Sequence, residues 1–304
     1  MGSNHYQNAS HGASSAYYSR RAHTATGHGV RKPQAKAKAK SVDANAIATG
    51  EKRLRRYRDK EPLSFGPILE RATTQRFYVL SQTACGTDDC PELFLQVSGS
   101  TGNVYDVCIA QQPSCSCPHA LAGNQCKHIV FVLKKVLRAS HHHVYQLALL
   151  STELVEIMGK ASQRAHAASW DQRTGEDGRK AVEGDCPICF DEMGVGRGSE
   201  PLVWCQGACG QNIHRRCMEV WAATKRQAGR AAEVPCPYCR APWTEAGAGA
   251  DRTSRSVDIG RAKFTRDGYQ NVADQVDVST RRDYSTYSRW WSGHPDYYGR
   301  RRYR

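Results

Sequence analysis

Most of the cysteines in this chain stand in closely spaced pairs that suit metal binding. Ten of the 13 cysteines, together with two histidines, fall into such pairs. Two ligands a few residues apart can bind one zinc ion without distorting the chain, and zinc takes four nitrogen or sulfur ligands. The candidate ligands are Cys115, Cys117, Cys126, His128, Cys186, Cys189, Cys205, Cys209, His214, Cys217, Cys236 and Cys239. They predict three zinc ions.

The alternative is that these cysteines form disulfides or remain free thiols. Disulfide scaffolds are typical of secreted proteins, which follow a signal peptide with an apolar core. This chain opens MGSNHYQNAS, which has no apolar stretch, and Tyr6 stands where N-myristoylation expects serine or threonine. No apolar run approaches the roughly 20 residues that span a bilayer. We therefore expect no membrane contact, a reducing cytoplasmic or nuclear compartment, and metal ligands rather than disulfides.

Three cysteines and a histidine run fall outside the twelve ligands. Cys85 and Cys90 could form half of a further site, but we expect them and Cys108 to be free thiols. Residues 141–143 are consecutive histidines. Consecutive side chains on a helix point about 100 degrees apart, so these three cannot face one ion, and we expect a solvated helix start.

The chain is strongly basic. Its formal charge is +14 at pH 7 and its isoelectric point is near 9.3. Ten zinc-bound thiolates and three divalent ions would reduce the charge only to about +10. Association with polyanions or acidic protein surfaces is therefore expected, whatever the fold.

Both ends of the chain lack the apolar residues needed for a core. Residues 1–50 are rich in Ser, Ala, Gly, His and Lys, and residues 244–304 alternate arginine with aromatic residues towards their end. Such compositions cannot offset the entropy lost on ordering. We therefore expect a disordered basic N-terminal tail and a disordered Arg/Tyr-rich C-terminal tail.

Residues 51–160, the first module, mix helical and strand patterns. Two short helices are expected in EKRLRRYRDK and SFGPILERATTQRF, followed by a strand at FYVLS. ELFLQV and NVYDVCI alternate apolar and polar residues across the turn SGSTG, which predicts a β-hairpin. The segment after Cys126, KHIVFVLKKVLR, predicts an amphipathic helix, and a further helix is expected at about 144–158 with its apolar stripe in the core.

A polar linker, residues 161–184, separates this module from residues 185–243, the second module. The linker composition predicts that the two modules move independently. The second module is too short for a large apolar core, so zinc must stabilise it, by about 10 to 16 kcal/mol per structural site. The expected fold class is thus a set of small α+β zinc-stabilised modules flanked by disordered tails.

The first module resembles the SWIM zinc finger over residues 102–138. The shared order is a hairpin, Cys115-x-Cys117, Cys126-x-His128 and an amphipathic helix, written here CSCPHALAGNQCKH. The resemblance implies a structural zinc site in a domain that contacts protein or DNA. His119 is the alternative to His128 as the fourth ligand.

The second module resembles a RING finger, in which ligand pairs alternate between two ions. Cys209 stands where the commonest RING has histidine, and the spacing from Cys209 to His214 is nearer to that of a PHD finger, a reader of histone tails. The resemblance to RING implies two groups of four ligands. They are Cys186, Cys189, His214 and Cys217 for one ion, and Cys205, Cys209, Cys236 and Cys239 for the other.

Further residues favour RING over PHD. A PHD finger carries tryptophan two residues before its seventh ligand, where this chain has Val234. Ile188, Trp221 and Pro237 match positions from which RING fingers contact a ubiquitin-conjugating enzyme. Arg240 matches the residue that bridges this enzyme and ubiquitin. The alternative for Ile188, Trp221 and Pro237 is that they only pack the small domain.

A SWIM finger followed by a RING finger resembles a group of RING-type ubiquitin ligases. The resemblance implies ubiquitin and a conjugating enzyme as partners, an unnamed protein substrate, and no catalytic residue or covalent intermediate on this chain. The competing hypothesis is a zinc-dependent nucleic-acid or chromatin-binding protein without ligase activity. It draws on the basic charge, the SWIM finger and the Arg/aromatic C-terminus, which could stack on bases.

Overall fold

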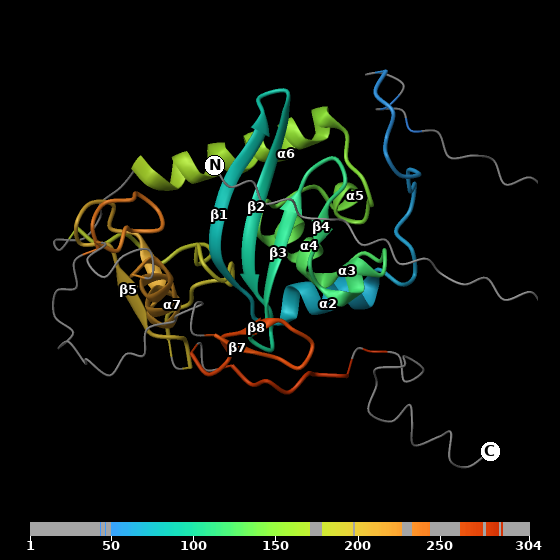
Figure 1. Ribbon diagram of the computed structural model, residues 1–304. Coiled ribbons are helices and arrows are strands. Elements are labelled where there is room, and N and C mark those ends of the chain that lie inside the picture. The colour runs from blue at the N-terminus through green and yellow to red at the C-terminus, as the bar shows by residue number, and fades with distance from the viewer. Residues whose placement is uncertain are drawn as a thin grey trace, which may run out of the picture. The chain divides into compact units, whose positions relative to one another are not determined.

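The computed structural model describes most of the chain between residues 50 and 287 (Figure 1). The described residues are 43, 46, 50–170, 178–196, 198–226, 233–243, 262–275, 278–285 and 287. Almost all of the predicted N-terminal tail lies outside them. The helices are α2 (Gly66–Thr74), α3 (Pro118–Leu121), α4 (Lys127–Phe131), the π-helical turn η1 (Val132–Val136), α5 (His141–Val144), α6 (Ser151–Trp170) and α7 (Arg215–Arg226). The strands are β1 (Tyr78–Thr87), β2 (Cys90–Ser98), β3 (Val104–Ile109), β4 (Ser114–Cys115), β5 (Leu202–Trp204), β6 (Asn212–His214), β7 (Lys263–Phe264) and β8 (Gln270–Asn271).

The first module is built on a four-stranded antiparallel sheet in the order β1-β2-β3-β4 (Figure 1). The predicted hairpin is confirmed as β2 and β3, with Leu95 opposite Val107 and Val97 opposite Tyr105. All four side chains are buried, as the alternating pattern requires. Strand β1 runs beyond the predicted FYVLS and forms a second hairpin with β2.

A helical layer packs on this sheet after the second ligand pair. The predicted helix following Cys126 is confirmed, but its second half widens into η1, where the Leu137 amide donates to the Val132 carbonyl at 2.9 Å. The ring of Phe131 stacks on Phe77 with centroids 4.7 Å apart. With Phe65 these two residues are fully buried and anchor the core.

The helix predicted at 144–158 begins later and ends later than expected. α5 ends at Val144, where the helix was expected to begin, and α6 runs from Ser151 to Trp170. Residues 161–170, assigned to the linker, are therefore helical. The break is stabilised by side chains: the Glu153 carboxylate accepts from the Leu150 amide at 2.9 Å, and Glu51 accepts from the Ser151 amide. Carboxylates that satisfy the first amides fix where a helix begins.

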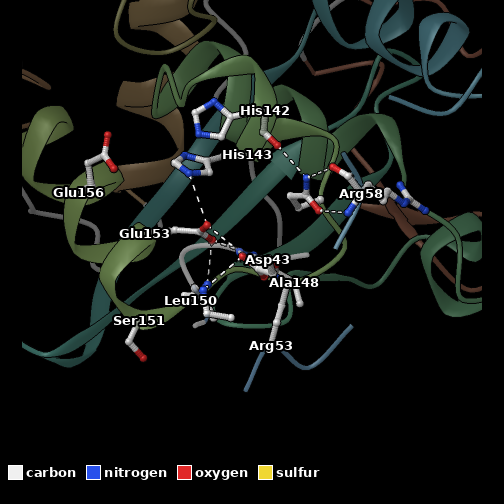
Figure 2. Close-up of polar contacts among 12 residues, drawn as sticks. Asp43, Arg53, Arg58, His142, His143, Ala148, Leu150, Ser151, Glu153 and Glu156 are labelled. Carbon is white, nitrogen blue, oxygen red and sulfur yellow. Dashed lines mark hydrogen bonds and ion pairs between the residues drawn. The ribbon is translucent and has the colours of Figure 1, made fainter. Parts of the chain in front are cut away.

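The helix predicted for EKRLRRYRDK is wrong, because its backbone bonds to another segment instead. The Arg58 amide donates to the Gln146 side chain, and that side chain donates back to the Arg58 carbonyl. Figure 2 shows Arg53 beside Glu153, where its guanidinium donates to both carboxylate oxygens at 2.7 and 2.8 Å and to the Ala148 carbonyl. The extended segment thus ties the α5–α6 connection to the rest of the module.

Part of the predicted C-terminal tail is folded. Strands β7 and β8 form a hairpin on the first module, with Tyr269 Oη donating to the Ser116 carbonyl at 3.1 Å. The Asn271 side chain donates through Nδ2 to the Thr101 carbonyl, and Val272 is fully buried. The expectation of disorder therefore fails for residues 262–275, because buried residues of both modules supply the core that this segment lacks.

The second module holds little regular structure. It contains the short β5–β6 hairpin and α7, with Ile213 and Met218 buried among the cysteines. The linker composition predicted that the two modules move independently, but the structure shows them in contact. Both contribute to one hydrophobic cluster, and the Val79 amide of β1 donates to the Ile188 carbonyl at 2.9 Å. No described helix is long and apolar enough to cross a bilayer.

One histidine of the run 141–143 is buried rather than solvated. His143 is 2% exposed, and its Nδ1 has no hydrogen-bond partner in the described structure. Figure 2 shows its ring directed at Glu153, with Nε2 3.7 Å from Oε1. Burial, opposed by the nearby carboxylates, lowers the pKa of His143 below its ordinary value of 6.5.

This burial predicts acid sensitivity. The unfolded chain gains a proton at residue 143 as pH falls below about 6.5, whereas the folded chain does not, so stability is lost in that direction. We expect His143→Gln to reduce the loss of unfolding free energy between pH 7.5 and 5.5, measured by urea denaturation. The exposed neighbour provides the control: His142→Gln should retain most of the loss, because burial is the larger cause of the lowered pKa of His143 and the charge of His142 the smaller one. Equal pH dependence in wild type and His143→Gln would contradict the assignment.

Candidate metal centres

The first cluster joins the sheet of the first module to its helix. Cys115 ends β4, Cys117 precedes α3, and Cys126 and His128 begin α4. Their ligand atoms all lie within 4.8 Å of one another, and all four residues are buried. His119 lies outside this group and is exposed, so the structure places His128 in the fourth position.

Aromatic rings fix the orientation of His128. Its ring lies 4.3 Å from that of Tyr105 and 5.7 Å from that of Phe77, measured between centroids. Its Nδ1 is 3.7 Å from Cys115 Sγ. Burial lowers the pKa of His128, which keeps the imidazole neutral, as a metal ligand must be.

The second module brings its eight candidate ligands together in two interleaved clusters. Each cluster joins one ligand pair that precedes β6 to a second pair that begins at the end of β6 or follows it, and within each the ligand atoms lie within 4.8 Å. The first holds Cys186, Cys189, His214 and Cys217, and the second holds Cys205, Cys209, Cys236 and Cys239. This is the alternation that the resemblance to RING implies.

Each cluster contains one thiol that ionises readily. Hydrogen bonds from Cys115 and Cys126 lower the pKa of Cys117, and the hydrogen bond from Cys236 lowers the pKa of Cys209 to about 5. Burial opposes ionisation of Cys186, yet hydrogen bonds from Cys189 and other ligands lower its pKa well below the usual value. Thiolates at tetrahedral spacing, with at most one imidazole, fit zinc. Three such clusters confirm the predicted zinc-stabilised modules and their three-ion capacity.

The two Cys-x2-Cys loops of the second module share a backbone geometry. The residue after each second cysteine, Phe190 or Arg240, has a left-handed φ, 57° and 65° respectively. Its amide donates to the first cysteine of the pair, to Cys186 O at 2.8 Å and Cys236 O at 3.0 Å. A side chain in this conformation costs roughly 1 to 2 kcal/mol. The spacing of the ligands in the sequence did not predict this left-handed backbone conformation.

The four residues predicted to contact a conjugating enzyme differ in exposure. Arg240 is exposed, and Pro237 and Trp221 are half-buried. The Trp221 indole donates to the Pro235 carbonyl at 2.7 Å, and the Lys225 ammonium lies 4.2 Å above its ring. Ile188 is only 1% exposed.

A residue that the sequence did not single out reaches the first cluster of the second module. The Arg76 guanidinium, from the first module, donates to Cys217 Sγ at 3.4 Å and to Glu200 Oε2 at 2.8 Å. Glu200 in turn lies 3.9 Å from His214 Nδ1. Arg76 and Cys217 are 141 residues apart, so no local pattern could have revealed this contact.

The remaining cysteines join no described cluster. Cys85 and Cys90 lie on paired strands β1 and β2, where Cys85 faces Glu92 and Cys90 faces Thr87. Burial and the nearby Glu92 raise the pKa of Cys108, which favours its protonated thiol.

Comparison with known proteins identifies the second module. Residues 184–240 match the family model of the Ring finger domain. The E3 ubiquitin-protein ligase Zswim2 of Mus musculus is 30% identical over 148 residues, 45% of this chain and 23% of that protein. Mitogen-activated protein kinase kinase kinase 1 of Homo sapiens is 25% identical over 222 residues, 61% of this chain and 14% of that protein. No solved structure matches the chain significantly.

These matches confirm the RING finger and the resemblance to SWIM/RING ubiquitin ligases that the ligand spacing predicted. The chain spans less than a quarter of the length of the curated relatives it matches.

The clusters predict three zinc ions per chain. Elemental analysis of reduced, unchelated protein should find three, and Cys209→Ser should lower this to about two because three sulfurs bind zinc poorly at that cluster. Cys85→Ser removes a cysteine outside every cluster and should leave three. Two or fewer ions in the wild-type protein would contradict the assignment.

Proposed function

We propose that this protein is a RING-type ubiquitin ligase. The second module recruits a ubiquitin-conjugating enzyme and promotes direct transfer of ubiquitin to a lysine of a protein substrate. The RING match over residues 184–240 carries this proposal, and the similarity to Zswim2 supports it. The first module serves as a protein- or DNA-binding element, and the protein acts in the cytoplasm, the nucleus or both.

The bond changes in this proposal occur on the conjugating enzyme. The amine of a substrate lysine attacks the thioester carbonyl, an amide bond forms, and the thiolate of the conjugating enzyme leaves, while the amine loses its proton to solvent. The ligase needs no nucleophile for this. It accelerates the reaction by restricting bound ubiquitin to reactive poses before the attack, which reduces the entropy still to be lost.

Arg240 is suited to this restriction. It is exposed, and its backbone is fixed because it directly follows the ligand Cys239 and its amide donates a hydrogen bond to the Cys236 carbonyl. A guanidinium presents a planar set of donors that can bridge two acceptors at once, here one on the conjugating enzyme and one on ubiquitin. Zinc held by the neighbouring cysteines would keep the loop that presents Arg240 rigid.

Nucleic-acid binding without ligase activity is the rival function. This function is supported by the formal charge of +14. The structure adds little to that support, since most of the Arg/aromatic C-terminus lies outside the described residues. In the described part of that terminus, the ring of Tyr287 contacts another residue of the protein: the Arg71 guanidinium lies 4.3 Å from its ring centroid. A pure binder would show salt-sensitive affinity for nucleic acid and no ubiquitin transfer.

The decisive experiment is single-turnover discharge of ubiquitin from a charged conjugating enzyme, chosen by screening autoubiquitination over a panel of such enzymes. Arg240→Ala should slow discharge about tenfold or more, because one or two charge-assisted hydrogen bonds of roughly 1.5 to 3 kcal/mol are lost in the reactive pose. Affinity for the uncharged enzyme should hardly change. Arg240→Lys should recover part of the rate. Unchanged discharge in Arg240→Ala would count against the proposed role.

Trp221 tests the contact surface itself. Trp221→Ala should weaken binding of the conjugating enzyme by about 30-fold or more, as loss of a central aromatic contact costs roughly 2 kcal/mol or more. Trp221→Phe keeps a ring but removes the donor to Pro235, and it should retain much of the affinity. If Trp221→Ala instead loses zinc, or if both variants are equally impaired, the residue acts by packing the module.

A further inference from the structure

The strand β1 of the first module covers part of the RING finger. Val79 donates its amide to the Ile188 carbonyl at 2.9 Å, so the backbone of β1 binds the loop between Cys186 and Cys189. Tyr78, Leu80 and Ile188 belong to one buried hydrophobic cluster, and Ile188 is 1% exposed. In this arrangement Ile188 cannot contact a partner protein.

Charged side chains of opposite sign surround this covered loop. The first module contributes only bases and the second only acids, and together we call them the polar latch. The pairs are Arg76 with Glu200 and Asp191, Lys135 with Asp191, and Arg138 with Asp185. Lys135 and Asp191 are in direct hydrogen-bond contact, and Arg76 Nε faces Asp191 Oδ2 at 3.4 Å.

The polar latch acts on the loop that carries Ile188. Asp191 lies three residues after Ile188 and is held by two of the three bases. Between them, Phe190 packs edge-on against Phe131 of the first module, with centroids 6.3 Å apart. Backbone, apolar and ionic contacts therefore all fix one short stretch of the RING against the first module.

We propose that the first module holds the RING in a closed arrangement, in which β1 covers Ile188, and that a conjugating enzyme must open this arrangement to bind fully. This regulation rests on the proposed ligase function. The alternative is that Ile188 is a permanent part of the core, in which case loosening the contact would only destabilise the RING. The two readings predict opposite effects of breaking the polar latch.

The test removes the bases that touch no zinc ligand. Lys135→Gln/Arg138→Gln should raise the affinity for the selected uncharged conjugating enzyme roughly three- to tenfold and speed ubiquitin discharge, as expected for the loss of two partly exposed ion pairs that favour the closed state. Lys134→Gln is the control for removal of a base from this turn: it removes one positive charge beside Lys135, and Lys134 has no ion pair with the described residues. It should behave as wild type.

A second measurement needs no substitution. Hydrogen exchange of the full chain should show the Val79 amide protected in the free protein and exposed to exchange once an excess of the conjugating enzyme is bound. If the Val79 amide stays protected from exchange in the complex, the proposal that the closed arrangement regulates binding is wrong. Lower affinity, or loss of zinc, in the Lys135→Gln/Arg138→Gln protein overturns it as well.

The two proposals fail separately. If wild-type protein discharges ubiquitin while latch variants match it in affinity and rate, the latch is wrong and the ligase function stands. If neither wild type nor the latch variants bind or discharge any conjugating enzyme of the panel, the ligase function fails, and the latch proposal with it.

Discussion

The crowding of buried sulfur atoms is the constraint on which the rest of the structure depends. Each of the three clusters holds its ligand atoms within 4.8 Å of one another. Several thiolates so close repel one another and are costly to bury, unless a cation compensates their charge. Zinc supplies that compensation, and folding brings together the ligands that bind the zinc. Folding and metal binding are therefore one process in this protein.

The clusters differ in how much apolar core supports them. Cys115, Cys117 and Cys126 belong to the large core of the first module, where sheet and helices bury the aromatic rings beside His128. Among the described hydrophobic residues, those that pack against the second cluster of the RING without being its ligands are the partly buried Tyr238 and Trp243. Since little hydrophobic burial assists it, that cluster depends most on its metal, and the loop presenting Arg240 depends on it in turn.

The sequence predicted correctly those features that depend on residues close together in the chain. The ligands, the β2–β3 hairpin and the helix after Cys126 follow from spacing and alternation within short stretches. The sequence could not predict that the Arg53 to Arg58 segment would bond to the α5–α6 connection instead of forming a helix. Nor could it predict the burial of Val272 or the reach of Arg76 to Cys217. Those features depend on partners about 90 to 170 residues away along the chain.

The composition of the contact between the modules suits a reversible closure. Partly exposed ion pairs contribute at most about 1 kcal/mol each, and salt screens them. The burial of Ile188 with Tyr78 and Leu80 and one backbone hydrogen bond add to this. On opening, the charged and backbone groups regain hydration, whereas the apolar side chains lose the free energy of their burial. The proposed closure requires that the closed and open arrangements differ by only a few kcal/mol, an amount that the binding energy of a protein partner of ordinary affinity can supply. A wholly apolar interface of the same extent would resist such opening, because exposing it would cost the full hydrophobic term.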